Sequence, residues 1–282
     1  MGIATNQQIA NYYESYQSTE IIFSKEVLKT LHINPREIYI KCNGSQWPCI
    51  INSMSFTMAK IIIGTNGGAF AQITEEENAT VSVRLCFVEN GKTTLSFFIS
   101  GHVSEITPYM DSTQLSIVKI SFKQRPPDDF ISKIGELIEA NQNFLKRKEE
   151  RVTVSKETQH QLGLEKTEGI LIIDEKPTKC ILRDLSFSGA KVLLASTPEK
   201  LLDKNVILAL QFTDSMEPTK LEGAIVGASS IEGMQGITSA NIHFVQETIS
   251  MEYKIHINNY ITATRKNILE NSNKSPKNNL TE

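Results

Sequence analysis

The sequence has few cysteines, no long apolar run and no excess of basic charge. Its 282 residues include four cysteines, too few for a fold held together by disulfides. No apolar run approaches the ~18 residues that a membrane-spanning helix needs, and the N-terminus lacks a basic start followed by an apolar stretch. The net charge of −3 argues against a protein coated in nucleic acid. We therefore expect a cytoplasmic protein that does not contact a membrane.

The common enzyme motifs are also missing. The sequence contains no HExxH, no CxxC, no nucleophile elbow and no complete phosphate-binding loop. Its five histidines are scattered along the chain, and none stands near cysteines at the spacing of a zinc site. We therefore predict that the protein is not an enzyme and holds neither a metal nor a cofactor.

What the chain does contain is two series of short strands. A length of 282 residues is about twice that of a typical domain, which predicts two domains. Segments rich in Ile, Val, Phe and Thr, separated by turn residues, are typical of small barrels or sandwiches. The first predicted series comprises residues 37–42, 47–53, 58–63, 79–87, 93–100 and 115–122. The second comprises residues 151–155, 169–174, 178–184, 189–195, 205–213, 219–229 and 236–246.

Helices flank and separate these series. Apolar residues at helical spacing predict helices after Thr5, after Ser24, after Pro127 and at the C-terminal end. The paired prolines at 126–127, followed by two aspartates, mark the clearest boundary. The predicted fold is mostly β, with two small β-barrel domains joined by a helical linker and with N- and C-terminal helices. The predicted divisions are residues 1–125 for the first domain, 126–146 for the linker helix, 147–265 for the second domain and 266–282 for a disordered tail.

Two short polar motifs stand out in the second half. Arg147 and Arg151 lie four residues apart, although only seven of the 29 basic residues are arginine. The planar fork of arginine suits phosphate or the edge of a guanine. Between two predicted strands, Asp184 and Ser186 alternate with apolar residues, and Gly189 permits a tight turn or a close approach to a ligand. Either motif alone is common, as the solvated end of a helix or as a β-turn.

In this order and in β surroundings, the two motifs resemble the signature of the PilZ domain family, bacterial receptors for cyclic di-GMP. That signature is Arg-x-x-x-Arg followed by (Asp/Asn)-x-Ser-x-x-Gly, and here 33 residues separate Arg151 from Asp184. The resemblance covers roughly residues 143–262 and implies a six-stranded antiparallel barrel. The first 125 residues resemble PilZN-like domains. The whole resembles the two-domain PlzA-like PilZ proteins of spirochaetes, notably around residues 46–49.

The resemblance implies a cyclic di-GMP site at the start of the second domain. Arg147 and Arg151 would contact phosphate oxygens and the O6/N7 edge of guanine. Asp184 would accept hydrogen bonds from guanine N–H groups, and Lys146 would add a less specific phosphate contact.

Three further residues complete the predicted site. Ser186 would donate or accept a hydrogen bond, and Gly189 would let the backbone approach the ligand. Asn241 stands where family members often carry glycine, so it either weakens the pocket or adds a hydrogen bond of its own.

The position of the arginines also suggests an output. They lie where the linker helix enters the second domain, so we expect ligand binding to change the arrangement of the two domains. The resemblance implies control of motility, virulence or gene expression through an unidentified protein partner, by a chain that we expect to be monomeric. Two alternatives stay open: a nucleic-acid-binding β-barrel whose basic segment contacts phosphates, and a PilZ-like adaptor that needs no ligand.

Overall fold

The structure, a computed structural model, describes residues 5–76, 78–89, 93–215 and 217–274. The chain divides into two compact units, Met1–Ile138 and Glu139–Glu282. The division falls inside α4 (Asp128–Lys146), the helix that follows the paired prolines. Most of the regular structure is β-strand, which confirms the predicted mostly-β fold. Of the two predicted barrels, the strand pairings of the described residues close the second, whereas the first unit has an open sheet.

The first unit is built on one antiparallel sheet of eight strands. Their order in the sheet is β1-β4-β5-β8-β7-β6-β2-β3. The strands are β1 (Ile21–Ile22), β2 (Tyr39–Cys42), β3 (Ser45–Pro48), β4 (Ile50–Met54), β5 (Met58–Gly64), β6 (Thr80–Glu89), β7 (Thr93–Pro108) and β8 (Leu115–Phe122). The helices before α4 are α1 (Asn6–Tyr16), α2 (Lys25–Thr30) and α3 (Gly68–Glu75). The side chains of Thr5 and Ser24 cap α1 and α2, which confirms both predicted helix starts.

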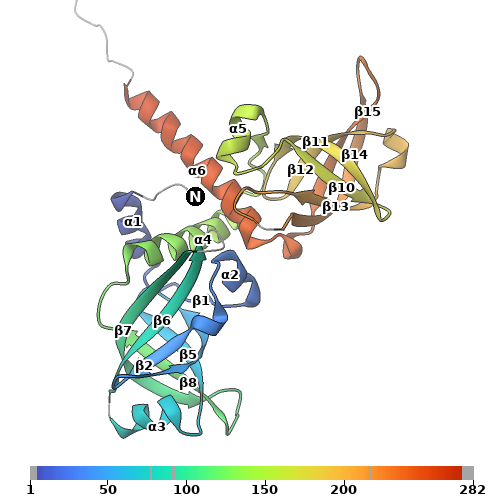
Figure 1. The fold of residues 1–282 in the computed structure, drawn as a ribbon. Helices are drawn as coiled ribbons and strands as arrows, with labels where there is room; N and C mark the ends of the chain where they lie inside the picture. The colour runs from blue at the N-terminus through green and yellow to red at the C-terminus, as the bar shows by residue number, and fades with distance from the viewer. Residues whose placement is uncertain (1–4, 77, 90–92, 216, 275–282) are drawn as a thin grey trace, which may run out of the picture. The chain divides into compact units, whose positions relative to one another are not determined.

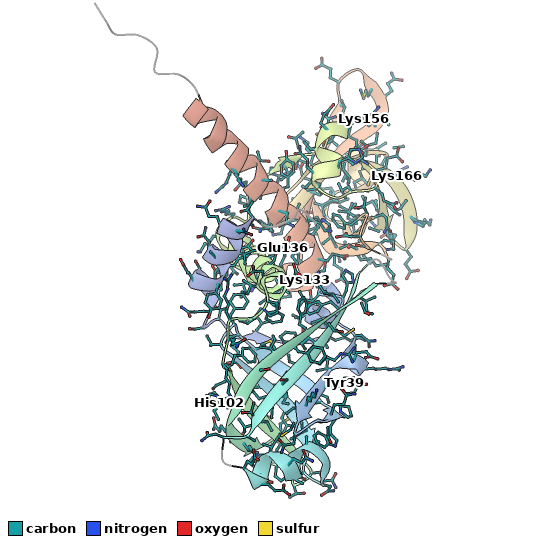
Figure 2. All side chains as sticks on the ribbon, turned by 60° about the vertical axis from the view of Figure 1, so that its left-hand side comes forward. Tyr39, His102, Lys133, Glu136, Lys156 and Lys166 are labelled. Atoms are coloured by element: carbon teal, nitrogen blue, oxygen red, sulfur yellow. The ribbon has the colours of Figure 1, made fainter. Side chains whose placement is uncertain are left out.

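Aromatic side chains form the centre of the first unit. Phe130 of α4 packs edge-on against Phe56, Phe87 and Phe97, with ring centroids 6.2–6.5 Å apart. On the outer face of the sheet, the Arg84 guanidinium lies 5.7 Å from the ring centroid of Tyr39; Figure 2 labels Tyr39 on this unit. Arg84 also donates to Glu37 and Ser96, so the first unit uses this arginine in its own packing.

The second unit is a closed six-stranded antiparallel barrel. The ring runs β10-β13-β14-β15-β12-β11, and the pairing of β10 with β11 closes it. Figure 1 labels these strands. Its strands are β10 (Glu168–Ile173), β11 (Lys176–Leu185), β12 (Gly189–Ala195), β13 (Asn205–Leu210), β14 (Thr219–Ile231) and β15 (Met234–Phe244). A two-residue strand, β9 (Val152–Thr153), adds to the edge of β11. The barrel that the family resemblance implied is therefore confirmed.

Helices complete the second unit. α5 (Lys156–Gln161) lies within the segment that connects β9 to β10, and Figure 2 labels Lys156 at its start. α6 (Met251–Lys274) begins beside the barrel (Figure 1) and buries Tyr253, Ile257 and Ile261 in its core. Residues 266–274, assigned from the sequence to the disordered tail, belong to α6, which runs to Lys274. The rest of the predicted tail, residues 275–282, lies outside the described residues.

Candidate functional site

The arginine segment, residues 147–151, follows α4 directly and is held against the barrel. Lys146 is the last residue of α4 and is exposed, and the Arg147 N–H still donates to the Asn143 carbonyl at 2.8 Å. Next, the Lys148 carbonyl accepts a hydrogen bond from the Ser188 hydroxyl at 3.0 Å. The half-buried Arg147 guanidinium makes no ion pair or hydrogen bond with any residue that the structure describes. It is therefore available to a ligand.

An ion pair joins the two predicted motifs. Arg151 Nη1 lies 2.6 Å from Asp184 Oδ1, although 33 residues separate them in the chain. The Arg151 side chain is 46% exposed and that of Asp184 is 19% exposed. Pairs this accessible to water contribute about 0–1 kcal/mol, because hydration and side-chain entropy offset most of the attraction. A ligand can therefore exchange with either partner at little cost.

The second motif forms the turn between β11 and β12. β11 ends at Leu185, so the strand alternation expected from the sequence does not reach Ser186. Ser186 is fully buried, whereas Asp184 is half-buried on the outer face. The Ser186 hydroxyl accepts a hydrogen bond from the Gly189 N–H at 3.0 Å, and the Ser186 N–H donates to the Gly189 carbonyl at 2.8 Å. This serine shapes the turn that follows Asp184.

Gly189 lies where two strands approach each other closely. A Cβ atom at this position would lie 2.2 Å from the Ile242 carbonyl oxygen on β15, well inside contact distance. The absence of a side chain at Gly189 therefore allows the backbone of β15 to approach β12 closely. Behind the turn, the Tyr253 hydroxyl donates to the Ser186 carbonyl at 2.8 Å. Burial raises the pKa of Tyr253, and the nearby charge of Asp184 adds to the effect, so the hydroxyl stays protonated as a donor.

Asn241 shares a cross-strand row with Asp184. Asp184 of β11 pairs with Lys191 of β12, Lys191 pairs with Asn241 of β15, and Asn241 pairs with Gly227 of β14. Directly opposite residues on adjacent strands project to the same face of a sheet. The Asn241 amide nitrogen lies 3.3 Å from where a Cβ of Gly227 would stand, so this glycine gives the asparagine room.

A groove of about 550 Å³ lies on this outer face of the barrel. Thr153, Arg183, Asp184 and Lys191 line it along β9, β11 and β12. The β14–β15 hairpin, residues 229–234, lines it from the other side through Ser229, Ser230, Ile231 and Met234. Arg183 and Lys191 bring two positive charges to the groove and Asp184 one negative charge, which suits an anionic ligand.

The predicted residues occupy three places relative to the groove. Asp184 lines it, and Arg151 contacts Asp184. Asn241 continues the row on the same face, while Ser186 and Gly189 form the buried turn beside it. Lys146 and Arg147 stand at the end of α4.

Sequence reasoning missed Lys191 and Arg183. Lys191 alternates with the buried residues Ala190 and Val192, so its outward direction could have been inferred from the pattern of β12. Its position beside Asp184 depends on strand register. Arg183 lies at a register shift between Leu182 and Asp184, so two consecutive residues, Arg183 and Asp184, line the groove. The alternation of residues along a strand does not predict such a shift.

The described ranges contain neither a candidate metal site nor a candidate membrane-spanning helix. No group of three or more His, Cys, Asp or Glu side chains within them could hold a metal ion. Across the same ranges, no helix combines the length and the apolar character that crossing a membrane requires.

The chain is similar to known proteins over nearly its whole length. A protein of Treponema denticola named "Cyclic di-GMP binding protein" is 38% identical over 268 residues, covering 94% of this chain and 85% of that protein. The crystal structure of Borreliella burgdorferi PlzA in complex with c-di-GMP matches with a TM-score of 0.40 and 20% identity, covering 90% of this chain and 98% of PlzA. The crystal structure of Escherichia coli YcgR in complex with c-di-GMP matches with a TM-score of 0.30 and 13% identity, covering 89% of this chain and 92% of YcgR.

The family matches follow the two units. Residues 7–141 match the PilZN3 domain, and residues 145–263 match the PilZ domain. Both motif halves, the groove and the closed barrel lie within the second match. With a relative 38% identical across 85% of that relative's length, the chain belongs to the PilZ domain family and carries a PilZN3 domain ahead of its PilZ domain.

Proposed function

We propose that this protein is a receptor for cyclic di-GMP, which it binds on its PilZ domain and does not turn over. The observation that carries the proposal is the 2.6 Å contact between Arg151 and Asp184, which brings the two halves of the motif together beside an open groove. The name of the Treponema denticola relative supports the choice of ligand.

The proposed binding mode begins with an exchange of partners. The ligand breaks the exposed Arg151–Asp184 pair, so that the guanidinium turns to a phosphate or to the O6/N7 edge of guanine. The freed Asp184 carboxylate accepts hydrogen bonds from guanine N–H groups. Arg147, which the described structure leaves without a partner, supplies the second planar cation, and Lys146 supplies a phosphate contact.

Three other residues of the predicted site act on its shape and on its edge. Ser186 and Gly189 hold the β11–β12 turn that presents Asp184. Asn241 adds an amide that can donate and accept at the far end of the same row.

We further propose that binding changes the arrangement of the two units and thereby acts on a protein partner in control of motility, virulence or gene expression. The arginine segment directly follows α4, the helix inside which the units divide, so reordering this segment acts at the junction. Small-angle scattering with and without saturating cyclic di-GMP tests this step. Superimposable curves would refute it without touching the binding proposal. Sedimentation of the same samples tests the expected monomeric state.

The binding proposal is tested by calorimetric titration of the full chain with cyclic di-GMP beside an Arg147→Ala/Arg151→Ala variant. Charge-assisted hydrogen bonds contribute about 1.5–3 kcal/mol each, so losing one arginine should weaken binding roughly 10- to 100-fold. Both arginines are accessible, so the variant should remain folded; its thermal melt is the control. No binding by a folded wild-type protein would favour the adaptor alternative. Salt-sensitive binding of single-stranded nucleic acid instead would favour the nucleic-acid alternative.

A further inference from the structure

Lys191 stands at the centre of the outer row, between two residues of the predicted site. It pairs directly with Asp184 on one side and with Asn241 on the other. The Cβ atoms of directly opposite residues in antiparallel strands lie about 4.5–5.5 Å apart. Any ligand that reaches both Asp184 and Asn241 must therefore pass over Lys191.

The charge of Lys191 is not used within the described structure. Its ammonium group makes no hydrogen bond or ion pair with any described residue, whereas the neighbouring carboxylate of Asp184 is engaged by Arg151 at 2.6 Å. The side chain is half-buried, so its stem lies along the groove and is partly sheltered from water. A half-buried cation without a protein partner suits an anionic ligand group.

The groove around Lys191 has two unlike sides. Asp184 and Arg183 give one side a polar, charged edge, while the β14–β15 hairpin brings the apolar side chains of Ile231 and Met234, beside Ser229 and Ser230, to the other. Leu193, two residues beyond Lys191, also lines the groove. A planar base has apolar faces and a polar edge, so such a groove accepts a base with its linked phosphate beside the lysine.

We propose that Lys191 is a ligand-binding residue that contacts a phosphodiester of the bound cyclic dinucleotide, outside the two recognised motifs. The inference rests on the proposed function and deepens it. Lysine carries a compact charge with rotatable donors and no plane, so it matches non-bridging phosphate oxygens better than the fixed edge of a base. The planar guanine edges are left to the arginines and to Asp184.

The test is a titration of the full chain with cyclic di-GMP at low and at raised salt. Lys191→Met keeps the apolar stem and removes the charge; we expect it to weaken binding about tenfold at low salt. Because salt screens the lost attraction, the ratio between wild type and variant should shrink at about 0.5 M salt. Lys191→Arg should retain most of the affinity. Lys220→Met, an exposed lysine on β14 outside the groove, is the matched control and should bind like wild type.

The outcomes separate this inference from the proposed function. Wild-type binding that is lost in the double arginine variant but unchanged in Lys191→Met would overturn the role of Lys191 and leave the receptor proposal standing. Weakening by Lys191→Met to the same degree at both salt concentrations would overturn the phosphate contact. No binding by the folded wild-type chain would overturn both proposals. Matching thermal melts of the Met and Arg variants exclude misfolding as the cause of any loss.

Discussion

We predict that Gly189 is required for the stability of the PilZ domain even when no ligand is bound. The substitution Gly189→Ala places a methyl group 2.2 Å from the Ile242 carbonyl oxygen, about 1 Å or more inside contact distance. Because that oxygen belongs to the backbone of β15, the clash cannot be relieved by turning a side chain. The β12 and β15 backbones must separate at the pair Gly189–His243.

Overpacking of this kind costs about 1–3 kcal/mol. For a unit of this size, each kcal/mol shifts the melting temperature by about 4 °C, so we expect Tm to fall by about 4–12 °C. Differential scanning calorimetry of the full chain without ligand measures this shift in the transition of the second unit. The transition of the first unit should not move.

Gly227→Ala is the matched control on the same barrel. Its new methyl group would lie 3.3 Å from the amide nitrogen of Asn241, the end of a flexible side chain that can move. We expect a shift well below that of Gly189→Ala. If Gly189→Ala melts like wild type, the reasoning from strand contact is refuted, and a ligand contact would have to explain this glycine instead.

Two further predictions concern contacts made by side chains of α6, Tyr253 and His256. Tyr253→Phe should lower the free energy of unfolding by about 1–3 kcal/mol, because the substitution leaves the buried Ser186 carbonyl without its donor. Urea unfolding measures this loss. An unchanged midpoint of unfolding would contradict the prediction. The hydrogen bond from His256, together with the charge of its imidazole, holds the pKa of Asp214 below its ordinary value of 3.8. Because the folded pKa is lowered, the stabilisation is present above pH ~4 and is lost as pH falls through the folded value. Unfolding curves between about pH 2.5 and 6 should therefore show a steeper acid loss in wild type than in Asp214→Asn.

Local signals in the sequence predicted the elements that depend on a few neighbouring residues. Thr5 and Ser24 cap helices as expected, and α4 begins directly after the paired prolines. α3 was not predicted, because its glycine-rich start also reads as a turn. β9 is limited to Val152–Thr153 where five residues were expected, since its pairing with β11 ends there.

The candidate site was predicted as far as residue types and chain spacing allow. The contact between Arg151 and Asp184 follows from a motif, but Lys191 becomes a neighbour of Asp184 only through the register of β11 and β12. Register depends on pairings far apart in the chain, which alternation along one strand does not determine. The burial of Ser186 was missed for a related reason, because the strand ends one residue before it.

The end of α4 has a practical consequence for dissecting the protein. Phe144 packs edge-on against Phe187 of the motif turn, with ring centroids 5.9 Å apart, and the amide of Asn143 donates to buried Asn258 of α6 at 2.6 Å. A fragment that starts at Arg147, where the motif begins, would remove both partners and expose a buried phenylalanine on the turn. A fragment that starts at Glu139 keeps them, as well as the carboxylate that accepts from Asn258. An isolated PilZ domain from this chain should therefore include the last two turns of a helix that contains none of its motif arginines.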